Sequence, residues 1–381
     1  MENKTSQKRL LPVFLSFFVM SFCDLAGITI DRVKSPDIFS LGDFAIQFIP
    51  SVVFVWFFFL SIPVGVWQDR YGKKNILNAG MIITALGMFI PYFLFSKAAL
   101  FIGFALLGIG NTIVQVSANP LLLDVVAGKK ASYMSFSQFI KAVGSMTAPY
   151  AAAFCADKFG DWKLMFLFFG VTSLLSVLWL RSTPIEESKN TERRATIASA
   201  LGLLKNNYVA FMALGIFLLV GLDVGINSIS GQFFVQHYHS ASEYAEKARS
   251  FYFFGKMLGT FLSAIILTKV SSSRFLFLSC LVSFILLAAL TIAPTEGVAM
   301  VLFVAIGFST AAVFPLIFSL TVEKYPARAN EISGLMIMAV SGGAVIPPVM
   351  GFVNQQLGII QALMVLAACG LYLLGLSLKK A

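Results

Sequence analysis

The chain has 381 residues, of which 58% are apolar and only 12% charged, and its mean hydropathy is +0.85. A soluble domain of this length carries about a quarter charged residues, so the composition excludes an ordinary soluble protein. The net charge of +10 would suit a nucleic-acid partner. Most basic residues, however, fall in alternate gaps between apolar runs, which indicates membrane topology and no nucleic acid.

Apolar runs of membrane-spanning length recur from end to end. A run of roughly 20 apolar residues crosses about 30 Å of hydrocarbon as a helix. The sequence therefore predicts an all-α polytopic membrane protein with twelve transmembrane helices, at about 10–30, 45–67, 76–95, 99–123, 131–154, 162–180, 208–234, 248–267, 273–293, 297–321, 329–353 and 358–378.

The basic residues predict the orientation. Those expected on the inner side include Lys4, Lys8, Arg9, Arg70, Lys73, Lys74, Lys129, Lys130, Arg181, Arg193, Arg194, Lys379 and Lys380. This bias predicts that both termini lie in the cytoplasm. We expect the protein in the cell inner (plasma) membrane. The first run contains Asp24 and lacks an A-x-A-like cleavage site, so we expect a helix and no signal peptide.

A short polar segment, Gly65–Lys74, separates the second and third runs. Gly65 would let a neighbouring helix approach closely, and Gly72 can adopt the φ > 0 conformation of a tight turn. The cationic residues are expected at the lipid headgroups. We expect this segment to form a conformational latch, a contact that holds two helical bundles together on the cytoplasmic side, and not to bind solute. Its residues are Gly65, the acid–base pair Asp69 and Arg70, Gly72, Lys73 and Lys74.

The longest polar stretch, 181–207, divides the chain into an N-terminal part at 1–180 and a C-terminal part at 208–381, with six runs each. Asp24 in the first run and Asp223 in the seventh are 199 residues apart, and Pro149 and Pro348 show the same separation. This pattern predicts two pseudo-symmetric six-helix bundles around a central site. Chance similarity among apolar segments is the alternative.

Four charged residues lie deep within the predicted helices, away from their ends, namely Asp24, Lys141, Asp223 and Lys256. A charge at the centre of the bilayer costs a few kcal/mol, so such residues usually face a cavity or a partner. Other polar residues share helical faces with them or with one another: Gln115, Asn119, Gln138, Asn227 and Tyr252. We expect these side chains to bind a hydrophilic solute. The alternative is that they join helices by hydrogen bonds.

No pattern of catalytic residues accompanies them. The sequence contains no HExxH, no P-loop and no GxGxxG in a βαβ setting, so we expect no enzyme. The four cysteines lack metal-ligand spacing and are expected to be small buried residues. We therefore expect neither a metal nor a cofactor.

The spacing G-x-x-x-D-R-x-G-K-K in Gly65–Lys74 resembles the loop signature of the major facilitator superfamily. Other stretches resemble the fucose:proton symporter and glucose/galactose transporter family within it. These are Gln115-Val-Ser-Ala-Asn119-Pro120, Gln138-Phe-Ile-Lys141-Ala-Val-Gly144, Phe314-Pro315-Leu-Ile-Phe-Ser-Leu and Gly342-Gly343-Ala-Val-Ile-Pro347.

The resemblance implies alternating access, with a monosaccharide site near the membrane midplane and transport driven by a cation. In the family an Asp of the first helix takes part in proton coupling, and Asp24 is the acid nearest to that position in this sequence. Asp223 lies where family members carry a Glu. Gln115 and Lys141 stand where the family has an acid and an Asn. Both departures make the site more positive, so an acidic sugar such as a hexuronate rivals a neutral hexose.

We therefore expect a secondary active transporter that imports a neutral hexose or deoxyhexose with a proton, or with Na⁺. Asp24, Asp223 and Lys141 would couple the proton, with one acid pairing with Lys141 in one conformation. Gln115, Asn119, Gln138, Lys141, Asn227, Lys256 and Tyr252 would bind the sugar. The alternatives are a hexuronate-like or other organic anion symporter, and a non-transporting receptor on a carrier fold. The partners expected are the sugar, the cation and the bilayer, with a monomeric protein.

Overall fold

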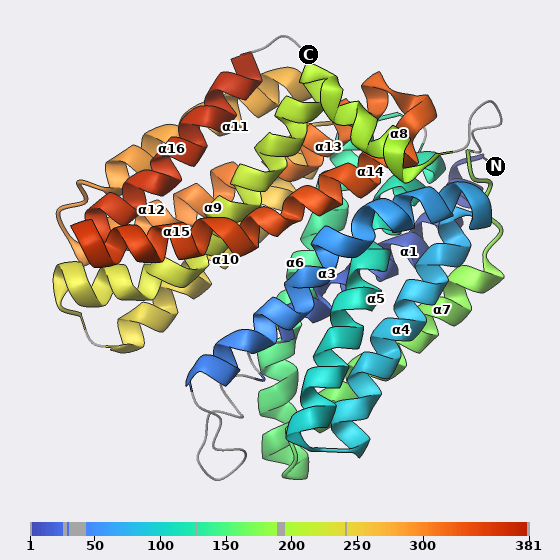
Figure 1. Cartoon of the computed structure of the whole chain (residues 1–381), viewed down its shortest axis with the longest axis horizontal. Coiled ribbons are helices and arrows are strands. Elements are labelled where there is room, and N and C mark those ends of the chain that lie inside the picture. Colours follow the sequence, from blue (N-terminus) through green and yellow to red (C-terminus); the bar gives the residue numbers. More distant parts are fainter. Residues whose placement is uncertain are drawn as a thin grey trace. The chain divides into compact units, whose positions relative to one another are not determined.

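A computed structural model describes residues 2–25, 29, 43–126, 128–188, 195–240 and 242–378, and these residues contain helices and no strand. The first half comprises α1 (Glu2–Met20), η1 (Ser21–Asp24), α3 (Asp43–Tyr71), α4 (Lys73–Phe93), α5 (Lys97–Val125), α6 (Lys130–Phe159) and α7 (Leu164–Ser182) (Figure 1). After α8 (Ile197–Gly202) and η2 (Leu203–Lys205) come α9 (Asn207–Tyr238), α10 (Ser242–Ile266), α11 (Ser272–Leu290), α12 (Glu296–Thr310), α13 (Val313–Lys324), η3 (Pro326–Arg328), α14 (Ala329–Met338), η4 (Ala339–Ser341), α15 (Gly342–Leu357) and α16 (Ile359–Leu378).

The helices agree with the predicted spans. Within the described residues, nine helical segments are long and apolar enough to cross a membrane. The three other predicted spans correspond to α1, α6 and α10, which carry more polar residues. The chain is a polytopic helical membrane protein.

Two predicted spans are interrupted in ways that the apolar pattern does not show. The tenth divides at Ala311–Ala312 into α12 and α13. Pro315 explains the break, because its ring and missing N–H prevent a regular helix from continuing through the preceding turn. The eleventh divides into α14 and α15 around η4, immediately before Gly342 and Gly343. Glycine is a poor helix former, which is consistent with a break there.

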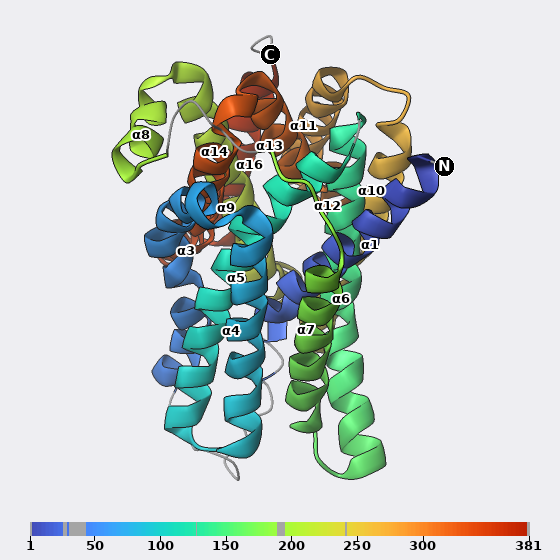
Figure 2. The same cartoon turned by 90° about the vertical axis from the view of Figure 1, so that its right-hand side faces the viewer.

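The chain forms two compact units. The first consists of residues 1–128, 140–201 and 327–338. In it α5 packs against α1, α3 and α4, and α4 also packs against α7. Figure 2 shows α4 and α5 side by side. The buried face of α5 runs almost without interruption through its second half, so α5 is the central helix of this unit.

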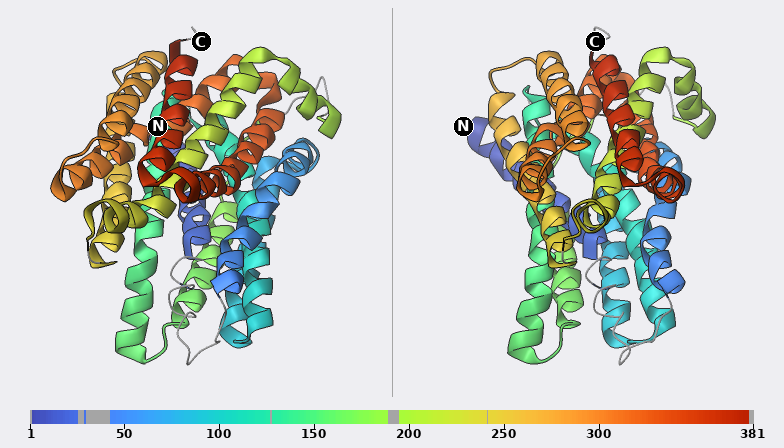
Figure 3. Two further views of the ribbon diagram at one scale, coloured as in Figure 1. Left: turned by 60° about the vertical axis from the view of Figure 1, so that its left-hand side comes forward. Right: turned by 90° about the vertical axis from the view of Figure 1, so that its left-hand side faces the viewer.

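The second unit consists of residues 129–139, 202–326 and 339–381. In it α9 packs against α10, α13, α15 and α16, while α12 packs against α10 and α11. The red C-terminal helices beside the yellow-green α9 can be followed in Figure 3. Its core contains Phe233, Phe234, Tyr252 and Phe303, all with 1% exposure or less.

The start of α6 and the whole of α14 belong to the unit of the other half of the sequence. Ala327–Met338 joins the first unit because Gly334 packs on the backbone of α3 at Ser61. Residues 129–139 join the second unit, where the Ser132 hydroxyl donates to the carbonyl of Ala264 at 2.5 Å. The division at 181–207 stays a prediction.

Equivalent helices begin at equal intervals in the two halves. Helices α4 and α11 begin 199 residues apart, and so do α5 and α12. The last two also share a capped start: Ser96 accepts from the Ala99 N–H at 3.1 Å, and Thr295 accepts from the Val298 N–H at 3.4 Å. The separation equals that between Asp24 and Asp223, which supports the internal repeat.

Candidate functional site

In the second unit, Asp223 of α9 is held by two side chains of α10. The Tyr252 hydroxyl donates to Oδ1 of Asp223, and the Lys256 ammonium donates to Oδ2. Tyr252 and Lys256 are one helical turn apart and so share a face of α10. The hydroxyl of Thr310 in α12 lies 3.4 Å from that of Tyr252. Residues from three helices therefore meet at one carboxylate.

This cluster differs from the expected division of roles. Tyr252 and Lys256 were predicted as sugar ligands, yet both bind the predicted coupling acid Asp223. Tyr252 is fully buried, whereas the side chains of Lys256 and Asp223 remain 26% and 17% exposed. The pair is electrically neutral as long as Asp223 is ionised, which lowers the cost of both charges in the membrane. Protonation of Asp223 would release the ammonium.

In the first unit, Asp24 of η1 faces α6. The Ser145 hydroxyl donates to Oδ2 of Asp24 at 2.5 Å, and the Cys23 thiol lies 3.6 Å from Oδ1. Lys141 precedes Ser145 by one helical turn, so both lie on one face of α6. Asp24 is exposed, and Lys141 is partly exposed. The predicted ion pair between Lys141 and an acid is not formed among the described residues of this conformation and stays a prediction.

The predicted polar stripe of α5 is hydrogen-bonded except at Oδ1 of Asn119, which is buried without a partner in the described part of the chain. Asn111 donates to the carbonyl of Met20 at 2.7 Å, and Gln115 donates to Oδ1 of Asn111 at 2.8 Å. Asn119 donates to the carbonyl of Gln115 at 2.8 Å. All three amides are buried. These contacts match the packing interpretation, and a sugar-binding role for Gln115 and Asn119 stays a prediction.

Two other predicted ligands retain unused polar atoms. Nε2 of Gln138 and Oδ1 of Asn227 are buried without a hydrogen-bond partner in the described part of the chain. A buried amide atom without a partner costs free energy unless water or a solute satisfies it. Gln138 and Asn227 are thus suited to donate to and accept from a hydroxylated solute.

The segment Gly65–Lys74 is more helical than expected. Helix α3 continues through Tyr71 and α4 begins at Lys73, so only Gly72 lies between them. Gly72 has φ = 84°, which confirms the predicted turn conformation. A Cβ on Gly65 would lie 2.6 Å from the carbonyl oxygen of Asn330. The expected close approach of a neighbouring helix at Gly65 is therefore confirmed, and that helix is α14.

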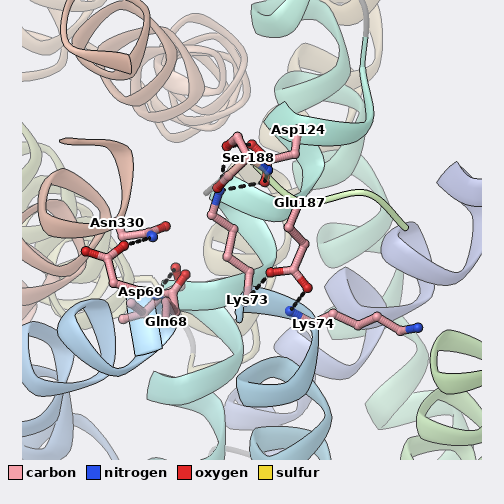
Figure 4. A network of polar contacts seen from close by, with 9 residues as sticks. Gln68, Asp69, Lys73, Lys74, Asp124, Glu187, Ser188 and Asn330 are labelled. Atoms are coloured by element: carbon pink, nitrogen blue, oxygen red, sulfur yellow. Dashed lines mark hydrogen bonds and ion pairs between the residues drawn. The ribbon is translucent and has the colours of Figure 1, made fainter. Parts of the chain in front are cut away.

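Lys73 does not reach the headgroups, and this expectation is wrong. Its side chain is only 2% exposed, and its ammonium contacts Asp124 at 2.5 Å and the Ser188 hydroxyl at 3.0 Å. Glu187 accepts from the backbone N–H groups of Lys73 and Lys74 at 2.5 and 3.1 Å. Figure 4 shows this network, in which residues after α7 join the start of α4 to the end of α5.

Asp69 contacts two segments that are distant in the sequence. Its Oδ1 accepts from the Asn330 amide of α14, and its Oδ2 accepts from the Ala195 N–H at 2.9 Å. Arg70 is exposed, with its guanidinium carbon 5.3 Å from the centre of the Tyr71 ring. Of the predicted pair Asp69 and Arg70, it is Asp69 that contacts segments distant in the sequence (Figure 4).

Sequence reasoning missed several partners of these residues. Asp124, Glu187, Ser188 and Asn330 contact the Gly65–Lys74 segment but were not predicted. Glu187 lies in a generic polar linker, where no periodicity distinguishes it from its neighbour Glu186. Asp124, at the end of an apolar helix, offered the one usable signal, because a lone acid there often has a basic partner.

Helices of spanning length with charged side chains inside them define an integral membrane protein. The family model described as Major Facilitator Superfamily matches residues 12–348. The chain belongs to this superfamily, and it is a transporter and not an enzyme.

Similar proteins cover almost the whole chain. A glucose/galactose transporter of Brucella abortus is 27% identical, with 94% of this chain and 90% of the relative covered. The L-fucose-proton symporter of Escherichia coli is 22% identical, with 84% and 81% covered. A crystal structure of the E. coli fucose:proton symporter matches with a TM-score of 0.82, 16% identity, and 97% and 98% coverage. The proton:xylose symporter matches with a TM-score of 0.77, 15% identity, and 98% and 95% coverage.

Proposed function

We propose that the protein imports a monosaccharide together with a proton by alternating access. The observation that carries the proposal is the near full-length similarity to proteins named as glucose/galactose and L-fucose–proton transporters. The two carboxylates support it, because Asp24 and Asp223 lie in equivalent places of the repeat and each accepts hydrogen bonds from neighbouring side chains. A membrane carboxylate that changes its partners can carry a proton through a transport cycle.

We assign the coupling proton to Asp24 first, because Asp24 is exposed whereas Asp223 is already neutralised by Lys256. Asn119, Gln138 and Asn227, each with an unused buried atom, are the favoured sugar ligands, and Gln115 is a secondary candidate. In this proposal both termini face the cytoplasm and the protein lies in the inner membrane. A proton is favoured over Na⁺ as the coupling ion.

The segment around Gly65–Lys74 is proposed as a conformational latch. Asp69 reaches α14, which comes from the other half of the sequence. Gly65 permits that approach, while Lys73 and Lys74 fix the start of α4. Alternating access requires contacts between sequence halves to break and re-form, and a small hydrogen-bonded contact is suited to this.

Substitution of Asp24 tests the proposal. Purified protein in liposomes should accumulate a labelled sugar when the outside is made acidic. Asp24→Asn should abolish this pH-driven accumulation and leave sugar exchange without a gradient measurable, because a proton carrier is lost while the sugar ligands remain. Asp157→Asn, at an exposed acid of the end of α6, is the matched control. Intact accumulation in Asp24→Asn would contradict the coupling role, and failure to transport any sugar would overturn the proposed function.

A further inference from the structure

Lys141 differs from the other ionisable residues of the predicted spans. Asp223 and Lys256 form an ion pair, and Asp24 accepts a hydrogen bond from Ser145. The Lys141 ammonium has no ion-pair or hydrogen-bond partner among the described residues, and it is partly exposed. A cation within the membrane costs a few kcal/mol without a counter-charge, so this ammonium is set up to bind an anion.

Ser145 connects Asp24 to the turn of α6 that carries Lys141. The Ser145 hydroxyl lies 2.5 Å from Oδ2 of Asp24 and 3.1 Å from the backbone carbonyl oxygen of Lys141. The register of the two helices is constrained between these residues: a Cβ on Gly144 would lie 2.2 Å from the hydroxyl oxygen of Ser21. Helix α6 therefore packs closely on η1 beside Asp24.

Charge balance then depends on protonation. With Asp24 ionised, the charges of Asp24 and Lys141 cancel in the first unit. With Asp24 protonated, the positive charge of Lys141 remains, and the Asp223 carboxylate is already paired with Lys256. A neutral sugar would leave that charge uncompensated during the loaded half of the cycle. A sugar carboxylate would cancel it and form a charge-assisted hydrogen bond with the ammonium.

We propose that the transported monosaccharide is anionic, a hexuronate or related sugar acid, and that its carboxylate binds Lys141 when Asp24 carries the coupling proton. This inference rests on the proposed function and names its substrate class. The proton adds to the Asp24 carboxylate on loading and leaves it on release, so one proton and one sugar monoanion cross together without net charge. Cys23 and Ser145 are the other polar groups at Asp24.

The test compares matched sugars in proteoliposomes of the full chain: D-glucose with D-glucuronate, and D-galactose with D-galacturonate. We expect an acidic outside pH to drive uptake of a uronate, and the neutral partner to compete at least tenfold more weakly. Because one proton and one monoanion together add no net charge to the protein, a potassium diffusion potential should leave the uptake rate unchanged. Proton symport of a neutral hexose would instead move one charge and respond to that potential.

Variants of Lys141 complete the experiment. Lys141→Gln should raise the half-saturating uronate concentration by about 10- to 100-fold, because one charge-assisted hydrogen bond is lost. Competition by the neutral hexose should not become weaker. Lys141→Arg keeps the charge and should retain most of the uronate preference. Lys97→Gln, at an exposed lysine of α5, should behave as the unsubstituted protein.

The outcomes separate the two proposals. The proposal of an anionic substrate would be overturned if a neutral hexose is taken up with protons, uronates do not compete, and Lys141→Gln leaves the selectivity unchanged. Monosaccharide–proton symport would then still hold. Binding of no sugar of either kind would overturn the proposed function itself, and the anionic substrate with it.

Discussion

The carboxylate of Asp223 is bound by a fully buried tyrosine and a partly exposed lysine, and this arrangement makes the three residues energetically dependent on one another. Removal of the lysine alone would leave a carboxylate without its counter-charge. Removal of both charges would leave two neutral groups. The pair should therefore behave non-additively when its members are substituted singly and together.

We predict a coupling free energy of about 1–3 kcal/mol between Asp223 and Lys256. Lys256→Gln should lower the unfolding temperature in detergent more than the double variant Asp223→Asn/Lys256→Gln does. Thermal unfolding of the single and double variants measures this. Additive losses would show that the contact contributes no stability beyond that of the separate side chains.

At the scale of helices, the start of α4 depends on a residue outside it. The first N–H groups of a helix have no partner within the helix, and here Glu187 accepts from those of Lys73 and Lys74. Its negative charge also suits the positive end of the helix dipole. The adjacent Glu186 is 92% exposed and lies 3.9 Å from Arg9. The two neighbouring glutamates therefore provide an internal comparison.

We predict that Glu187→Ala destabilises the protein by about 0.5–2 kcal/mol, the range for loss of a helix cap. Glu186→Ala should change stability by less than about 0.5 kcal/mol, as is usual for an exposed surface position. Chemical or thermal unfolding in detergent gives both values. Equal effects of the two substitutions would mean that the contacts of Glu187 do not stabilise the start of α4.

At the scale of the whole molecule, Asp69 connects α3, α14 and the linker before α8. Asp69→Asn removes the charge that both N–H donors contact, so it should change the maximal transport rate several-fold while KM changes less than about twofold. Initial-rate uptake over a range of sugar concentrations separates the two parameters. A loss of affinity at an unchanged maximal rate would count against the latch and place Asp69 in solute binding.

The helical architecture could be read from the sequence because membrane spans are limited by length and hydropathy. Gly72 was also predictable, since glycine adopts φ > 0 without the steric cost that a Cβ brings. The partners of the charged residues were not. Asp223 is bound by Lys256 in this structure, and the pairing of an acid with Lys141 stays a prediction. Helical spacing shows which residues share a face, but not which neighbouring helix that face meets. The linker residue Glu187 lacks any periodic context, so its capping role became visible only in the structure.

The single residue between α3 and α4 has a mechanical consequence. Because Gly72 alone is non-helical there, the φ and ψ angles of this one residue set the angle between the two helices. Its Cα already faces the Glu187 carboxylate, which a Cβ would approach to 3.1 Å. A tilt of α3 would therefore act on α4 through this residue and through α5, which packs against both helices. The angle between α3 and α4 therefore depends on the backbone of Gly72 and on its contact with Glu187.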